Sequence, residues 1–154
     1  MFIFFSLNSL ITVSISPTVV VINADKAITS GLIFSASSTI LADSFRLSQV
    51  IINLLSNAIK YNKNGGSVEI SYQESTAKKI RLQVKDSGIG ISEADQQMLF
   101  QPFNRLGLEN SNIEGTGIGL HIAKSLIEQM NGKLTFSSQL NIGTTFIIEL
   151  PRAS

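Results

Sequence analysis

The sequence predicts an α+β fold, in which an antiparallel or mixed sheet carries helices on one face. Apolar residues recur with helical spacing in two long segments, and they alternate with polar residues in several shorter ones. The short segments outnumber the helical ones and do not alternate strictly with them, which argues against a parallel βαβ arrangement. With 154 residues, 44% of them hydrophobic, the chain is large enough for one compact domain with a single core.

The N-terminal segment differs in composition from the rest of the chain. Its first 24 residues carry no charged side chain, and the start is rich in Phe, Leu and Ile. A secretory signal would begin with basic residues and a membrane span needs roughly 20 mainly apolar residues, whereas serine and threonine interrupt this stretch. We interpret residues 1–10 as an apolar remnant and residues 11–154 as the domain. We expect a first strand at Ile11–Ile15 and then a helix from Pro17 towards Thr29.

The long helix that follows has two distinct stripes. Asp43 is a plausible N-cap, and the polar, glycine-containing segment Asn62–Gly66 ends the helix. The first stripe is apolar and should pack on the core; it consists of Leu47, Val50, Ile51, Leu54, Leu55, Ala58 and Ile59. The second stripe is polar and consists of Asn53, Asn57, Lys60 and Tyr61.

The remaining elements follow from shorter patterns. Alternation at Val68, Ile70 and Tyr72 and again at Ile80, Leu82 and Val84 predicts a hairpin with a loop at Gln73–Lys79. A short helix is expected at Glu93–Leu99, and a polar loop at Leu106–Gly119 leads to an amphipathic helix at Ile118–Met130. Two final strands begin near Leu134 and Thr144.

The polar stripe of the long helix indicates a nucleotide site. Amide oxygens of Asn53 and Asn57 can ligate a hard cation, and the Lys60 ammonium can pair with phosphate. The aromatic ring of Tyr61 suits a flat base beside them. Amides, a cation and a ring along one wall therefore fit a metal-bound polyphosphate.

Asp86 stands out because it continues the inward phase of Ile80, Leu82 and Val84, so its carboxylate should face the buried layer. A buried carboxylate is costly unless donors satisfy it. One interpretation is that Asp86 only caps the turn at Ser87–Gly90. The other is that it accepts a hydrogen bond from the exocyclic amine of adenine.

Two features would support the second interpretation of Asp86. Gly88 and Gly90 would remove side chains where the base lies close. Thr144 begins the inward phase of the last strand, so its hydroxyl should approach Asp86 if the two strands are neighbours.

A second glycine-rich segment, Gly115-Thr116-Gly117-Ile118-Gly119-Leu120, opens the helix after the polar loop. Such a turn can expose the backbone N–H groups of a helix N-terminus to an anion. It lacks the Lys-Ser/Thr ending of a P-loop and does not follow a buried strand as a dinucleotide-binding fingerprint would. It gains meaning only together with the asparagines and Asp86.

Charge and composition exclude several other classes of protein. Twelve basic and 11 acidic residues give a net charge of +1, and no basic run indicates nucleic-acid binding. Because the chain has no cysteine and one histidine, thiolate catalysis, disulfides and zinc-thiolate or histidine-rich metal sites are excluded.

Taken in order, these motifs resemble the ATP-binding catalytic domain of sensor histidine kinases, within the superfamily of gyrase, heat-shock ATPase chaperones and mismatch-repair ATPases. The N box would be Asn53–Tyr61, the first glycine box Asp86–Ile91, the F box Phe100–Arg105 and the second glycine box Gly115–Leu120. Gly143-Thr144-Thr145-Phe146 and Leu150-Pro151 close the pattern. The resemblance implies a two-layer α/β sandwich of the Bergerat type, with a mixed, mostly antiparallel sheet on about three helices.

By this resemblance the cofactors are ATP and Mg²⁺. Asn57 would ligate the metal, Asn53 and Lys60 would hold phosphate, and these three would be the catalytic residues. Tyr61 would pack beside the base, Asp86 would bind the adenine amine, and Thr144 would support it directly or through water. The remaining binding residues would be Gly88, Gly90 and Ile91 around the base and Gly115, Thr116, Gly117, Gly119 and Leu120 at the phosphates. Leu106–Glu114 would form a mobile lid anchored by Phe100 and Phe103.

The residue at position 53 separates branches of the superfamily. In the ATP-hydrolysing branches a glutamate stands there and activates water, whereas the neutral amide of Asn53 has no useful basicity. The resemblance therefore implies transfer of the γ-phosphate rather than hydrolysis. The alternatives are an ATP-sensing or scaffolding module without transfer activity and a serine kinase of the anti-sigma type.

The chain also departs from the pattern of a complete histidine kinase, which carries a phosphoacceptor histidine on a dimerising helical hairpin. The sole histidine, His121, lies inside the second glycine box, where a γ-phosphate could hardly reach it in line. We expect a catalytic module whose partners are a separate or missing hairpin domain and a response regulator: a fragment, a split kinase or a truncated product. We expect it in the cytoplasm, with tethering through a missing sensor region as an alternative, but without membrane insertion of its own.

Overall fold

The structure, a computed structural model, describes residues 20–23, 42–76, 78–105 and 116–152. The strands of this part are β1 (Val20–Asn23), β2 (Ser67–Thr76), β3 (Lys79–Asp86), β4 (Lys133–Gln139) and β5 (Gly143–Pro151). The helices are α1 (Ser44–Lys60), α2 (Glu93–Gln96) and α3 (Gly119–Gln129). The predicted α+β class is confirmed.

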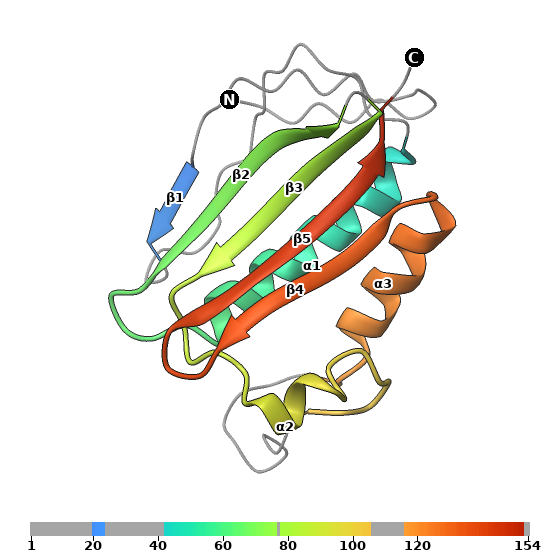
Figure 1. The fold of residues 1–154 in the computed structure, drawn as a ribbon. Helices are drawn as coiled ribbons and strands as arrows, with labels where there is room; N and C mark the ends of the chain where they lie inside the picture. Colours follow the sequence, from blue (N-terminus) through green and yellow to red (C-terminus); the bar gives the residue numbers. More distant parts are fainter. Residues whose placement is uncertain (1–19, 24–41, 77, 106–115, 153–154) are drawn as a thin grey trace.

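The strands form one five-stranded sheet in the order β1-β2-β3-β5-β4, and each neighbouring pair is antiparallel. Helices α1 and α3 lie side by side against one face of this sheet, and α2 lies near the N-terminal end of α3 (Figure 1). The two-layer arrangement expected from the sequence is therefore present in the described residues.

The hydrophobic core lies between the sheet and the two long helices. The apolar stripe of α1 faces it as predicted, with Leu54 and Leu55 almost fully buried. Inward residues of β3 and β5, such as Ile80 and Ile148, are also buried, and Ile127 contributes from α3. Removal of this much apolar surface from water is the main stabilising contribution to such a fold.

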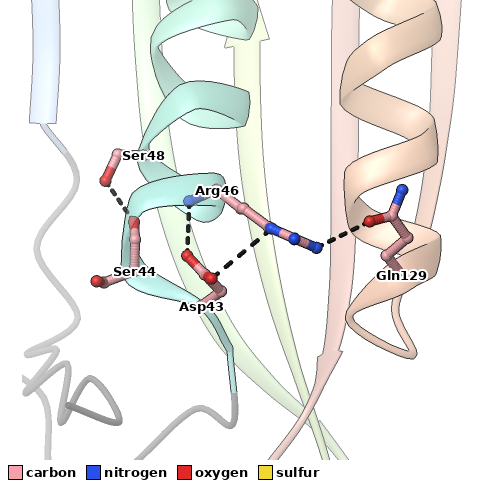
Figure 2. A network of polar contacts seen from close by, with 5 residues as sticks. All are labelled: Asp43, Ser44, Arg46, Ser48 and Gln129. Atoms are coloured by element: carbon pink, nitrogen blue, oxygen red, sulfur yellow. Dashed lines mark hydrogen bonds and ion pairs between the residues drawn. The ribbon is translucent and has the colours of Figure 1, made fainter. Parts of the chain in front are cut away.

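Helix α1 begins where the sequence predicted. The side chain of Asp43 accepts a hydrogen bond from the Arg46 N–H at 3.0 Å, which satisfies one of the donors left open at the helix start. Figure 2 shows the Arg46 side chain reaching from α1 to Gln129 at the end of α3, where its Nη1 donates to Oε1 at 2.8 Å. The start of α1 is thus joined to the end of α3, so the two helices run antiparallel.

The N-terminal prediction was wrong where it can be compared. Residues 20–23 form strand β1, which pairs with the start of β2, and not part of a helix from Pro17 to Thr29. The run Val19–Ile22 is β-branched throughout, which favours a strand over a helix when a sheet edge is available. The expected strand at Ile11–Ile15 and the domain division after residue 10 lie outside the described residues.

The boundaries of the other helices and strands lie closer to their predicted positions. Strand β2 continues to Thr76, so the predicted loop at Gln73–Lys79 is mostly strand, with a register shift between Glu74 and Thr76. Helix α2 ends earlier than expected, at Gln96, and helix α3 begins at Gly119, one residue later than predicted. None of the helices in the described part of the chain is long and apolar enough to cross a membrane.

Candidate nucleotide site

A cavity of about 920 Å³ lies between α1, the end of β3, the segment before α3 and the start of β5. Most of the residues predicted from the sequence line it: Asn53, Asn57, Lys60, Tyr61, Asp86, Gly90, Ile91, Thr116, Gly117, Gly119, Leu120 and Thr144. The fold therefore brings together residues that are up to 91 positions apart in the sequence, from Asn53 to Thr144.

The α1 wall of the cavity carries the polar stripe. Asn53 and Asn57 are half-buried, and the Asn57 Nδ2 donates to the Asn53 Oδ1 at 3.4 Å, a long and therefore weak hydrogen bond. The Lys60 Nζ lies 4.9 Å from the centre of the Tyr61 ring, within range of a cation–π interaction. These side chains are held by the helix backbone and make few strong contacts with one another.

Asp86 is the most buried charged group of the site, with 9% of its surface exposed. Its Oδ1 accepts from the Gly88 N–H at 2.8 Å and from the Thr144 N–H at 3.2 Å. Burial raises the pKa of this carboxyl above its ordinary value of 3.8, and the two backbone hydrogen bonds partly oppose that rise. Asp86 therefore caps its turn, through Gly88, and also lines the cavity.

The contact between Thr144 and Asp86 differs from the prediction in one respect. The strands β3 and β5 are neighbours, as the prediction required, but the Thr144 backbone N–H is the group that donates to Asp86. The Thr144 hydroxyl instead lies 2.8 Å from the Ser138 Oγ on β4. The reason is register, since Ser138 stands directly opposite Thr144 in the β4–β5 pairing.

Gly88 and Gly90 both stand at close backbone approaches, and their expected role in leaving room for a base stays a prediction. A Cβ at Gly88 would overlap the carbonyl oxygen of Tyr61, and one at Gly90 would overlap the carbonyl oxygen of Gln139. Gly90 also has φ of 66°, a left-handed conformation that favours glycine. The first glycine box is thereby pressed between the end of α1 and the β4–β5 turn, and Gly90, unlike Gly88, lines the cavity.

The second glycine box lies against the α1 wall. Gly119 begins α3, and a Cβ there would overlap the side-chain amide of Asn53. The N-cap of α3, Ile118, makes no side-chain capping hydrogen bond, so the first N–H groups of the helix are suited to an anion. Gly115 and the proposed lid at Leu106–Glu114 lie outside the described residues.

Several residues of the cavity were missed by the sequence analysis: Ser56, Ala58, Ile89, Ser92, Asp95, Leu99, Asn104, Leu140 and Phe146. Phe146 could have been found, because it shares the inward phase of Thr144 on β5. Leu140 lies in the turn between β4 and β5, where no periodic pattern exists to place it. Arg105, the last residue of the F box, also lines the cavity.

Two polar residues of α3, His121 and Lys124, lie outside the cavity lining. His121 is exposed, its Nδ1 lies 3.1 Å from the Phe100 carbonyl oxygen, and it does not line the cavity. The Lys124 Nζ lies 3.9 Å from a Glu128 carboxylate oxygen and 5.1 Å from the centre of the Phe100 ring. Both belong to the outer surface of α3.

Comparison with known proteins identifies the class. Residues 42–154 match the family described as histidine kinase-, DNA gyrase B- and HSP90-like ATPase, and the chain belongs to that family. The matched range begins after β1, whereas we had expected the domain to begin at residue 11.

Sensor kinases are among the similar proteins within this family. The chain is 42% identical over 111 residues to the signal transduction histidine-protein kinase BarA of Escherichia coli, covering 70% of this chain and 12% of BarA. It is 36% identical over 113 residues to the adaptive-response sensory kinase SasA of Synechococcus elongatus, covering 73% of this chain and 29% of SasA. The chain therefore spans only a small part of the curated relatives it matches.

Solved structures give the same class. The mycobacterial sensor histidine kinase MprB superposes with a TM-score of 0.68 at 27% identity, covering 75% of this chain and 78% of that one. The nucleotide-free catalytic domain of the histidine kinase ThkA superposes with a TM-score of 0.64 at 32% identity, covering 78% and 76%. The fold is that of a histidine-kinase catalytic domain.

Proposed function

We propose that this domain binds Mg-ATP in the cavity and supplies the γ-phosphate to a histidine on a separate helical-hairpin domain, from which a response regulator would receive it. The observation that carries the proposal is the pairing of two unlike walls in one cavity. A buried carboxylate, Asp86, lies on the sheet side, and the amides of Asn53 and Asn57 with the Lys60 ammonium lie on α1.

The sheet wall suits the base. Asp86 uses Oδ1 for two backbone donors, and its remaining acceptor capacity would receive the exocyclic amine of adenine. Thr144 would support this contact, while Ile91 and Tyr61 would offer apolar and aromatic surface to the ring. Gly88 and Gly90 would act indirectly, by letting the glycine box approach α1 and the β4–β5 turn.

The helix wall suits a metal-bound triphosphate. Groups of three or more His, Cys, Asp or Glu side chains that could hold a metal are absent from the described residues. Mg²⁺ nevertheless needs few protein ligands when phosphate oxygens and water complete its octahedral shell. The Asn57 amide oxygen fits that limited demand, with Asn53 next to it. When bound, the metal would neutralise phosphate charge.

The remaining residues of the α1 wall and the second glycine box would position the phosphates. The Lys60 ammonium would pair with a phosphate oxygen, and the backbone N–H groups of Gly117, Gly119 and Leu120 at the start of α3 would donate to others. Thr116 and Gly115 would belong to the same segment. Phosphoryl transfer relies mainly on such positioning and charge neutralisation.

Transfer is favoured over hydrolysis because α1 supplies no general base. Asn53 is neutral, and its amide cannot accept a proton from water. Asp95 also lines the cavity, but its Oδ2 accepts from the Ser92 hydroxyl at 2.6 Å as part of the α2 start. His121 is an unsuitable acceptor of the γ-phosphate, because it lies outside the cavity lining on the exposed surface of α3.

A reconstitution experiment tests the proposal. The chain is incubated with γ-labelled ATP and Mg²⁺, alone and with isolated phosphoacceptor hairpin domains from sensor histidine kinases. Alone, it should remain essentially unlabelled; with a compatible hairpin, acid-labile and base-stable label should appear on the hairpin histidine. His121→Ala should leave this transfer largely intact.

Three outcomes would contradict the proposal. Stable label on His121 of the isolated chain would mean that the domain phosphorylates itself. ATP binding without transfer to any hairpin would favour the ATP-sensing module, and label on a partner's serine would favour the anti-sigma type of kinase.

A further inference from the structure

Three polar side chains lie in a row across the inward face of the sheet, at the edge of its apolar core. Ser138 on β4 stands opposite Thr144 on β5. Lys85 stands opposite Thr145 on the other side of β5, so Asp86, the next residue of β3, lies beside Thr144. Asp86 and Thr144 line the cavity, whereas Ser138 lies one strand further out and does not.

The Ser138 hydroxyl is shared among three groups. It accepts from the Ile91 N–H at 2.9 Å, and it lies 3.2 Å from the Gly143 carbonyl oxygen and 2.8 Å from the Thr144 Oγ1. A hydroxyl has one proton to donate and two lone pairs. The Ser138 proton can therefore go to Gly143 or to Thr144, but not to both.

This choice fixes what Thr144 presents to the cavity. If Ser138 donates to Gly143, the Thr144 hydroxyl donates to Ser138, and the Thr144 oxygen offers only lone pairs elsewhere. If Ser138 donates to Thr144, the Thr144 proton is directed elsewhere. In both cases Ser138 removes one of the rotational options of the Thr144 hydroxyl.

Ser138 also holds the end of the first glycine box. Besides the Ile91 N–H on its hydroxyl, its carbonyl oxygen accepts from the Gln96 Nε2 at 3.2 Å, and the same Nε2 donates to the Ile91 carbonyl oxygen at 3.0 Å. The Asn141 N–H donates to the Ile89 carbonyl oxygen at 2.7 Å. The base side of the cavity is thereby joined to the β4–β5 turn at several points, and Ser138 is the residue common to the Ile91 and Thr144 contacts.

We propose that Ser138 is a positioning residue for base recognition, which orients the Thr144 hydroxyl and the Ile91 end of the first glycine box without touching the nucleotide. The proposal rests on the proposed function, because it assumes a purine nucleotide in this cavity. Its consequence is that Ser138 contributes to the preference for adenine over a purine of opposite hydrogen-bonding pattern.

The test compares ATP with inosine triphosphate, whose base presents an oxygen where adenine presents an amine. Ser138→Ala should weaken ATP binding about five- to tenfold, the scale of one lost hydrogen bond, with little change for inosine triphosphate. The dissociation constant for inosine triphosphate divided by that for ATP, both measured by calorimetry, should therefore fall by the same factor. Ser137→Ala, at the exposed neighbouring position on β4, is the matched control and should leave the ratio unchanged.

Two further variants complete the test. Ser138→Cys keeps the size of the side chain but loses the strong hydrogen bonds, so it should lower the ratio even if Ser138→Ala folds poorly. In a Thr144→Val background, Ser138→Ala should reduce the ratio much less than in the wild type.

Equal weakening of the binding of both nucleotides would show a merely structural role and overturn the proposal, as would an unchanged ratio in both Ser138 variants. If the wild-type chain binds neither nucleotide, the proposed function itself fails.

Discussion

The two walls of the cavity are built in different ways. On the sheet side, Asp86, Thr144 and Ser138 are fixed by hydrogen bonds to backbone and to each other, at distances between 2.8 and 3.2 Å for the contacts that join them or satisfy Asp86. On the α1 side, Asn53 and Asn57 share one long contact of 3.4 Å. The sheet wall is thus held by its own hydrogen bonds, whereas the polar groups of the α1 wall have fewer strong contacts with one another. Under the proposed function, this difference would separate recognition of the base from the binding of the charged phosphates.

The largest effect is expected from a substitution in the α1 wall. Asn57→Ala should reduce phosphotransfer to a hairpin partner by about a hundredfold or more, because loss of the proposed metal ligand would misplace the γ-phosphate as well as weaken binding. The rate of labelling of the hairpin histidine measures it. Asn64→Ala, at an exposed position beyond the end of α1, is the control. Unchanged transfer by Asn57→Ala would remove Asn57 from the site.

The second prediction concerns the sheet wall. Asp86→Asn should weaken ATP binding by roughly 1 to 3 kcal/mol, because the adenine amine would face an amide donor and remain unpaired. The Asn oxygen can still accept from Gly88 and Thr144, so the fold should survive. Calorimetry with purine riboside triphosphate, which lacks the amine, should show a much smaller loss. Equal losses for both nucleotides would contradict the adenine assignment.

A third prediction tests whether the contact between Gly119 and Asn53 affects the phosphates without affecting the base. Gly119→Ala should displace the Asn53 amide, since the new Cβ would overlap it, while the helical backbone accepts alanine readily. ATP affinity should fall by about 1 kcal/mol, the scale of one displaced hydrogen bond, whereas affinity for adenosine should not change. A loss shared by adenosine would mean that the change reaches the sheet wall.

The smallest expected effect is a dependence on pH. Because burial raises the pKa of Asp86 above 3.8, its protonation on acidification begins at a higher pH than for an ordinary aspartate. ATP affinity should therefore fall as pH decreases through that raised pKa. The contribution of Asp86 to the unfolding free energy should move the other way, since the folded state binds the proton more readily than the unfolded state between 3.8 and the raised value.

Calorimetry and chemical unfolding over this pH range check both trends, each as the difference between the wild type and Asp86→Asn. The subtraction matters because the pKa of another carboxyl group is also shifted, so that group contributes its own pH dependence. The Arg81 hydrogen bond, for example, lowers the pKa of Glu149 on the opposite face of the sheet. The absence of any difference between the two proteins would contradict an ionised Asp86 as the acceptor.

The long α1 and the central strands could be predicted from the sequence because their periodicity is strong and agrees with their burial. The inward position of Asp86 followed from the same alternation. Strand β1 could not be predicted, because a short β-branched run becomes a strand only when a sheet edge is present to pair with it. Pro17 suggested a helix start from local sequence, whereas the pairing of β1 with β2 depends on tertiary structure that the local sequence does not show.

The sequence predicted many of the residues that line the cavity, but few of the contacts among them. Alternation placed Thr144 on the inward face, but only the β4–β5 register shows that its hydroxyl meets Ser138. Ser138 shares the inward phase of Leu134 and Phe136, so the signal existed, although a serine there looked unremarkable without its neighbours. The roles of Gly88 and Gly90 depend on distant carbonyl groups, which no local pattern reveals.

The contacts between α1 and α3 have a mechanical consequence. At the start of α3, Gly119 packs against Asn53 in the middle of α1, and at the end of α3, Gln129 accepts a hydrogen bond from Arg46 near the start of α1 (Figure 2). Helix α1 has 17 residues and so extends about 25 Å at 1.5 Å per residue. Sliding of one helix along the other would have to break the Arg46 contact and drive the α3 backbone past the Asn53 amide, so shear between them is opposed at both ends. The spacing between the Asn53 amide and the start of α3 is thereby fixed by a second contact about two turns away along α1, at Arg46.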